Sequence, residues 1–117
     1  MHIEQEAVSD QIYRVAPHGR LDAVTVPPVE TAFDQQVAAG HVRLIIDLTH
    51  VTYISSSGLR VLLRVRRQTQ AAGGDIALYA MNERVAEVFE MIGFSKLFRI
   101  FPDAAAAAAA LTADSLA

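Results

Sequence analysis

The sequence of 117 residues has no cysteine and no tryptophan, and only 7% of its residues are aromatic. Without cysteine, neither a disulfide framework nor a thiolate metal site can form, a composition that fits the cytosol. Basic residues are outnumbered, since ten lysines and arginines face thirteen aspartates and glutamates for a net charge of −3. Such a chain lacks the concentrated basic surface that direct nucleic-acid binding through bulk charge requires.

Long apolar runs are missing as well. No stretch approaches the ~20 apolar residues of a membrane-spanning helix, and the first residues lack the basic-then-apolar order of a secretion signal. Hydrophobic residues nevertheless make up 52% of the chain, which is enough for one compact core. We therefore expect a single cytoplasmic domain over residues 1–117 that does not insert into a membrane.

The first half of the chain carries signals for a hairpin, a helix and a central strand. Two β-rich stretches, residues 3–8 and 11–15, flank a polar turn and predict a hairpin. Prolines open the stretch 26–39, for which Thr25 is the expected cap, and its apolar residues recur at every fourth position, as in a helix. The nearly continuous apolar run 42–48 is typical of a strand covered on both faces, so we expect it at the centre of a sheet.

The second half alternates between helix and strand signals. Residues 49–54 are expected to connect the central strand to a serine-capped helix, which begins at Ser55 and ends before Gly73. A strand over 75–80 follows, and this order implies a right-handed parallel crossover. Two further helices are expected, one capped by Asn82 and an alanine-rich one near the end of the sequence. The predicted fold class is α/β, a small mixed β-sheet with an N-terminal hairpin, covered by about four α-helices.

Three adjacent serines at the expected start of a helix, Ser55, Ser56 and Ser57, are the richest chemical feature of the sequence. Free backbone N–H groups and the helix dipole favour negative charge at such a place. A phosphoryl group on a serine would add nearly two negative charges and three acceptor oxygens, so a hydroxyl at this position could serve as a switch. Residue types alone favour plain helix capping over the switch.

Three arginines follow on one stripe of the same expected helix. Arg60 lies four residues beyond Ser56, within reach of a phosphate on that serine. A cation in the first turn opposes the helix dipole, so Arg60 gains nothing there without a nearby anion. Arg64 and Arg67 are expected to belong to an ordinary solvated face.

Signals for catalysis are weak. The Gly-x-Ser-x-Gly, Walker and Gly-x-Gly-x-x-Gly motifs are absent, so neither a hydrolase elbow nor a nucleotide-phosphate cradle is indicated. Asp22 and Asp47 could form a carboxylate pair, although Asp47 is better explained as the end of a strand. We predict no catalytic residue, no cofactor and no metal. Exposed positions near turns, rather than metal ligation, are expected for the four histidines, which are His2, His18, His41 and His50.

The stretch 53–63, Tyr-Ile-Ser-Ser-Ser-Gly-Leu-Arg-Val-Leu-Leu, is the most specific part of a resemblance that covers nearly the whole chain. Further matching segments are Gly-Arg-Leu-Asp at 19–22, Leu-Ile-Ile-Asp-Leu-Thr at 44–49, and the stretch from Ile-Gly-Phe to Phe at 92–98. On these segments the chain resembles the STAS domains, and among them the bacterial anti-sigma factor antagonists. The resemblance implies a STAS fold and a binding protein rather than an enzyme.

In that family, a serine in an Asp-Ser-Ser/Thr-Gly pattern is phosphorylated by a serine kinase of histidine-kinase-like ATPase fold, which is also the anti-sigma factor. The unmodified antagonist binds this kinase and frees the sigma factor; phosphorylation breaks the complex, and a metal-dependent serine phosphatase restores it. Aligned on Gly58, the acceptor is Ser56 and the family's aspartate is replaced by Ser55; Ser55 and Ser57 remain alternative acceptors. The implied kinase-binding surface, to which the phosphate argument adds Arg60, is formed by Asp22, Ser55, Ser57 and Gly58.

The resemblance also supplies an alternative function. STAS domains serve as adaptor subunits beside the ATPase of lipid transporters, a role that needs only a small domain and a binding surface. A kinase or sigma-factor gene next to the coding gene would favour the antagonist, and permease and ATPase genes would favour the adaptor.

Overall fold

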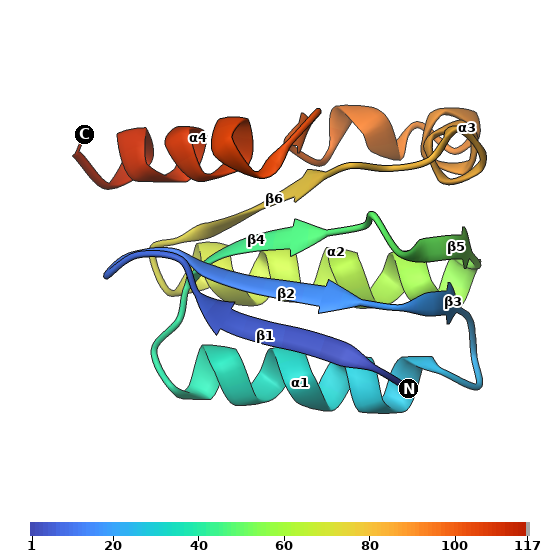
Figure 1. Ribbon diagram of the computed structural model, residues 1–117, viewed down its shortest axis with the longest axis horizontal. Coiled ribbons are helices and arrows are strands. Elements are labelled where there is room, and N and C mark those ends of the chain that lie inside the picture. The colour runs from blue at the N-terminus through green and yellow to red at the C-terminus, as the bar shows by residue number, and fades with distance from the viewer. Residues whose placement is uncertain (117) are drawn as a thin grey trace.

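The computed structural model describes residues 1–116, with side chains described through Asp114. Neighbouring strands of the main sheet lie in the order β1-β2-β4-β6-β7, and only the first pair is antiparallel. Figure 1 shows β1, β2, β4 and β6 in this order. This confirms the predicted hairpin, and the apolar strand β4 is central as expected. The five strands are β1 Ile3–Ala7, β2 Tyr13–Pro17, β4 Arg43–Asp47, β6 Asp75–Tyr79 and β7 Ile100–Phe101.

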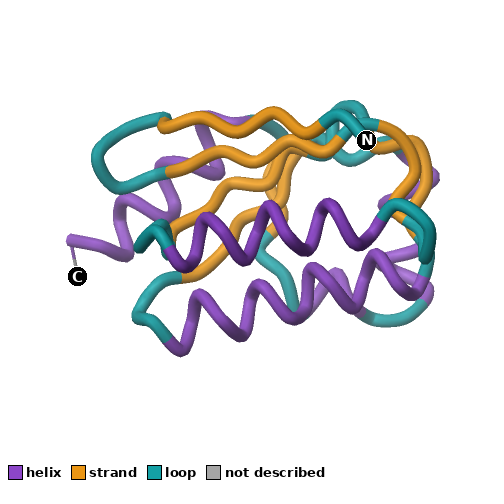
Figure 2. Tube along the Cα trace, turned by 90° about the horizontal axis from the view of Figure 1, so that it is seen from below, coloured by secondary structure: helices purple, strands orange, loops and turns teal. Residues whose placement is uncertain are grey.

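Helices cover both faces of this sheet, so the predicted mixed α/β fold class is confirmed. Figure 2 shows α1 (Val26–Ala38) and α2 (Ser56–Ala71) side by side on one side of the strands. The alanine-rich α4 (Ala104–Leu116) packs on β4 and β6 from the other side, while α3 (Glu83–Met91) and the short 3-10 helix η1 (Phe94–Lys96) pack against each other. Within residues 1–116, no helix is long and apolar enough to cross a membrane.

Alternation along the central strands divides the core between these two layers. Leu44 and Ile46 of β4 face the larger cluster, which includes the apolar residues of α1 and α2. Ile45 points the other way and packs with Ala107 and Leu111 of α4, which are both fully buried. Because alanine has a small side chain, α4 can approach the sheet closely while keeping a strong helix former at most positions.

A second sheet, not predicted from the sequence, carries the elements that lead into α2. β3 (Gly19–Leu21) and β5 (Val51–Ile54) form a parallel pair beyond the ends of β2 and β4. The prediction of a plain connector over residues 49–54 is therefore wrong for its last four residues. The pair escaped prediction because a three-residue and a four-residue strand are too short to show a periodic pattern.

Candidate functional site

The junction between β5 and α2 is built by backbone hydrogen bonds around Ser55. The Ser55 N–H donates to the carbonyl oxygen of Leu21 at 2.9 Å, which ties the end of β3 to the helix start. The Ser55 carbonyl then accepts the Leu59 N–H at 3.0 Å. Ser55 is extended, with φ −98° and ψ 176°, and the helix begins at Ser56. The short second sheet thus fixes where the serines stand.

The three serine hydroxyls lie in different surroundings. The Ser55 hydroxyl is buried and has no hydrogen-bond partner among the described residues. Ser56 is exposed, and Ser57 is half-buried, its hydroxyl accepting a hydrogen bond from Arg60 Nη2 at 3.2 Å. The prediction that a serine side chain caps α2 is wrong, because Ser55 occupies the cap position without a side-chain bond to the helix.

Gly58 sits where α2 packs tightly against β3 and β5. A β-carbon at this position would lie 2.8 Å from Ile54 Cγ1 and 2.8 Å from the Leu21 carbonyl oxygen. A glycine is therefore required by close packing rather than by an unusual backbone angle. Its contribution to the site is to let the serine-bearing turn sit directly on the second sheet.

Asp22 organises the loop between β3 and α1. Its carboxylate accepts the backbone N–H groups of Val24 at 3.0 Å and Thr25 at 3.2 Å. These backbone hydrogen bonds, chiefly from Thr25, together with the Arg20 side chain, hold the pKa of Asp22 below its ordinary value. Thr25 stands at the N-cap of α1, but the predicted cap is not formed by its side chain, because its hydroxyl donates to the Arg20 carbonyl at 2.6 Å instead.

This loop and the start of α2 border one open groove of about 380 Å³. Val24, at the tip of the loop, is 85% exposed, which makes it one of the most exposed large apolar residues described. The fold therefore brings the Asp22 loop and the predicted residues Ser57 and Arg60 to one surface. The groove is lined by Ala23, Val26, Pro27, Glu30, Ser57, Arg60, Val61 and Arg64.

Two further expectations about charged residues are resolved by the structure. Arg64 does not merely face solvent, because it bridges to Glu30 at 2.5 Å and Asp34 at 3.4 Å on α1. Asp47 ends β4, as expected, and its carboxylate accepts from Arg14 Nη2 at 2.7 Å. Burial opposes ionisation of Asp47, but hydrogen bonds from Thr49 and Arg14 outweigh it and hold its pKa below the ordinary value. Asp47 is thus committed to a structural ion pair.

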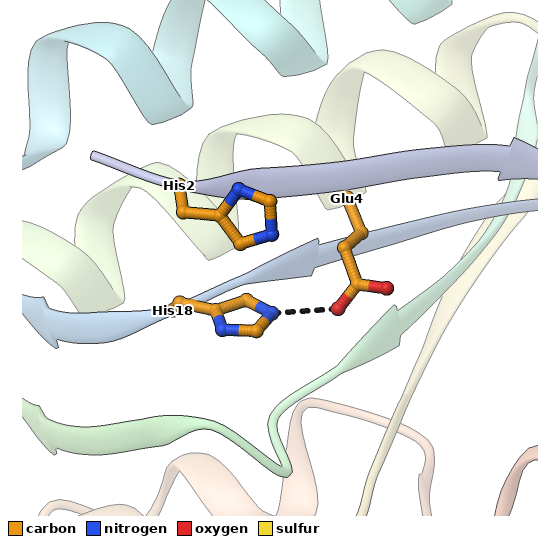
Figure 3. Close-up of side chains that lie close together, drawn as sticks. All are labelled: His2, Glu4 and His18. Carbon is orange, nitrogen blue, oxygen red and sulfur yellow. Dashed lines mark hydrogen bonds and ion pairs between the residues drawn. The ribbon is translucent and has the colours of Figure 1, made fainter.

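The sequence interpretation missed a cluster of histidines. His18 Nε2 lies 2.6 Å from Glu4 Oε2, and the rings of His2 and His50 pack against the His18 ring. Figure 3 shows His2, Glu4 and His18. Only the strand register could have revealed this, because His2 and His18 are far apart in sequence. Alternation over 3–8 and 11–15 places every second residue on one face, but the cross-strand partners depend on the turn.

Comparison with known proteins identifies the family to which this fold belongs. Residues 5–107 match the STAS domain family. BtrV of Bordetella bronchiseptica, named as a candidate anti-sigma factor antagonist, is 37% identical over 92 residues, which are 79% of each chain. The anti-sigma-B factor antagonist of Listeria monocytogenes is 30% identical over 82 residues, which are 70% of this chain and 72% of its own.

Solved structures of anti-sigma factor antagonists have a similar fold. An anti-sigma factor antagonist from Mycobacterium paratuberculosis has a TM-score of 0.82 at 25% identity, covering 95% of this chain and 93% of its own. Unphosphorylated SpoIIAA, an anti-sigma factor antagonist, has a TM-score of 0.71 at 18% identity, with 92% and 94% covered, a likeness of fold. On the matched residues and these relatives, the chain belongs to the STAS domain family.

Proposed function

We propose that this STAS domain, comprising residues 1–117, is an anti-sigma factor antagonist whose binding to an anti-sigma serine kinase is switched off by phosphorylation of Ser56. The observation that carries the proposal is the exposed Ser56 in the first turn of α2, next to Ser57, which lines one groove together with the loop that follows Asp22. The names of its relatives favour this function over the transporter adaptor. In this proposal the protein acts by binding and not by catalysis. Because sigma factors act in the cytoplasm, the protein is expected there.

Accessibility favours Ser56 over its two neighbours as the acceptor. A kinase must bring the serine hydroxyl to the γ-phosphate of ATP, which requires the hydroxyl to reach solvent. The Ser55 hydroxyl is buried, and the Ser57 hydroxyl is held by Arg60 at 3.2 Å. Ser56 alone among the three is exposed.

Phosphate at Ser56 would change the surface without opposing the fold. The first turn of α2 contains no acidic residue, and its N-terminal dipole favours an added anion by ~0.3–1 kcal/mol. Arg60, now bonded to Ser57, lies four residues beyond Ser56 and could turn toward the phosphate. The added charges would lie on the surface that the partner contacts, where desolvating a dianion is costly.

The acceptor is tested by incubating the protein with ATP and its cognate anti-sigma kinase, followed by phosphopeptide mass spectrometry. We expect phosphate on Ser56, full loss of the signal in Ser56→Ala, and its retention in Ser55→Ala and Ser57→Ala. A signal that survives in Ser56→Ala and is lost in one of the others would reassign the acceptor. No phosphate on any of the three serines would end the switch proposal.

Binding is tested with Ser56→Asp and the matched variant Ser56→Asn. The aspartate should weaken kinase binding by at least about tenfold, because it places a charge on the contact surface, whereas asparagine of the same size should cost less. The melting temperatures of both variants should stay near that of the parent. Equal loss of binding in the two variants would mean that shape, and not charge, operates at this position.

A further inference from the structure

Three side chains with metal-binding chemistry project from one face of the N-terminal hairpin. The register pairs Ile3 with Pro17, so His2 stands directly opposite His18, and the His18 N–H donates to the His2 carbonyl at 3.0 Å. Glu4 is two residues beyond His2 and therefore shares its face of β1. Figure 3 shows the three side chains gathered at this end of the hairpin.

Their donor atoms are close enough to share one ion. One ring nitrogen of each histidine and one carboxylate oxygen of Glu4 all lie within 4.8 Å of one another. Tetrahedral zinc with bonds of about 2.0–2.1 Å needs donors about 3.3 Å apart. Small side-chain rotations would open the 2.6 Å contact between Glu4 and His18 and draw His2 inward. The backbone, fixed by strand pairing, need not move.

We propose that His2, Glu4 and His18 form a binding site for a divalent transition-metal ion of the Zn²⁺ class. Two imidazoles and one carboxylate are a common ligand set for such ions, with the remaining positions left to water. His2 is exposed, and Glu4 and His18 are half-buried, so an ion can enter from solvent. The bound ion would tie the start of β1 to the segment that joins β2 to β3.

The surroundings suit a cation. Arg14 Nη1 lies 3.6 Å from Glu4 Oε1, but this arginine also contacts Glu6 at 3.0 Å and Asp47 at 2.7 Å. Three carboxylates therefore surround one guanidinium, which leaves a local excess of negative charge.

His50 acts as a positioning residue for the site. Its ring stacks on that of His18, with centroids 4.2 Å apart, and its carbonyl accepts the Gly19 N–H at 2.8 Å. This contact limits rotation of the His18 ring. We therefore expect His50→Gln to lower the affinity for the ion, but by less than removal of a ligand does.

The site is tested by titrating Zn²⁺ into the untagged chain by calorimetry at about pH 7.5, above the ordinary histidine pKa. We expect one saturable equivalent, and a loss of affinity of at least about tenfold in His2→Gln, Glu4→Gln and His18→Gln. His41→Gln is the matched control, because His41 stacks on Tyr13 away from this cluster. Its affinity should equal that of the parent.

A second readout keeps the proposal independent of folding. Long-range ¹H–¹⁵N spectra should show Zn²⁺-dependent shifts of the His2 and His18 ring nitrogens and unchanged signals for His41. Circular dichroism of each variant verifies that the fold is kept. The proposal is overturned by absence of saturable binding, by parent-like affinity in both His2→Gln and His18→Gln, or by equal loss in His41→Gln.

Discussion

The Ser55 hydroxyl is buried beside α2, yet it makes no hydrogen bond to any described residue. A serine at a helix cap normally stabilises the helix by ~1 kcal/mol through its side chain, but a buried hydroxyl without a partner costs ~1–3 kcal/mol. We therefore expect Ser55→Ala to leave the free energy of unfolding unchanged or to raise it by up to ~1 kcal/mol. Urea denaturation followed by circular dichroism measures this change. A loss of ~1 kcal/mol would instead show that the hydroxyl caps α2 in solution.

Adding a methyl group at Gly58 has one favourable and one unfavourable effect on the stability of the fold. In an exposed helix interior, Gly→Ala gains ~1 kcal/mol in helix propensity. At this position the new β-carbon would meet the Leu21 carbonyl oxygen at 2.8 Å, and overpacking against backbone costs ~1–3 kcal/mol. Because β3 would have to shift, we expect Gly58→Ala to lower the free energy of unfolding by up to ~2 kcal/mol net.

The matched control for Gly58→Ala is Arg67→Ala on an exposed face of the same helix. Its expected effect is within ~0.5 kcal/mol of the parent. Both are measured as shifts of the urea midpoint at constant slope. Stabilisation by Gly58→Ala would mean that β3 and α2 separate more easily than their hydrogen bond between Ser55 and Leu21 implies.

Residue types alone identified the serine triplet and Arg60 but misjudged how each side chain is used. Arg60 faces Ser57 rather than Ser56, and Arg64 joins two helices. The histidine cluster depends on which residues of the hairpin stand opposite each other, and residue spacing cannot supply this. At the residue scale, composition indicates the chemistry and the register decides which groups meet.

Among the elements, α3 shows a helix start in which the predicted cap is realised. The Asn82 side chain accepts the Val85 N–H at 2.8 Å and donates to the Val51 carbonyl at 3.1 Å. Asn82→Ala removes both bonds, so the free energy of unfolding should fall by ~1–2 kcal/mol. Thermal and urea unfolding measure it.

Asn82→Asp separates the two bonds made by this side chain. The aspartate keeps the acceptor for the Val85 N–H but cannot donate to the Val51 carbonyl. We therefore expect the free energy of unfolding of Asn82→Asp to lie between that of the parent and that of Asn82→Ala. Comparison with Ser55→Ala then contrasts two caps of the same molecule. Equal stability of Asn82→Ala and the parent would show that neither bond contributes in solution.

Long periodic segments were predictable at the element scale and short ones were not. The helices α1 and α2 follow from apolar periodicity, and the hairpin, β4 and β6 follow from β-rich or apolar stretches of about five residues or more. β3 and β5 depend instead on pairing between segments about thirty residues apart, where no local pattern is long enough to stand out. The position of the candidate site depends on that pair, because the Leu21 carbonyl holds Ser55.

At the scale of the whole molecule, an ion-pair network joins three strands of the main sheet. Arg14 of β2 donates to Asp47 of β4 at 2.7 Å and to the Tyr79 hydroxyl of β6 at 3.1 Å. Burial raises the pKa of Tyr79, so its hydroxyl stays protonated near neutral pH. The Arg14 and Asp47 side chains are only 16% and 10% exposed. Removing one charge would leave its partner largely shielded from water.

Asp47→Asn should therefore lower the free energy of unfolding by ~2–4 kcal/mol at neutral pH, near the cost of breaking a buried pair. The surface variant Glu6→Gln, whose residue also contacts Arg14 but is 62% exposed, should cost no more than ~1 kcal/mol. Urea denaturation at neutral pH compares both variants with the parent. A cost for Asp47→Asn no larger than that of Glu6→Gln would show that the pair is solvated.

The same pair predicts how stability depends on acid. Because the folded pKa of Asp47 is lowered, its contribution is fully present above the ordinary aspartate pKa of about 3.9 and is lost as the pH falls below that through the folded pKa. The difference in unfolding free energy between the parent and Asp47→Asn should thus be constant at higher pH and shrink on acidification below about pH 4. Urea titrations at a series of acidic pH values measure the difference. If it stays constant throughout, ionisation of Asp47 is not what holds the three strands together.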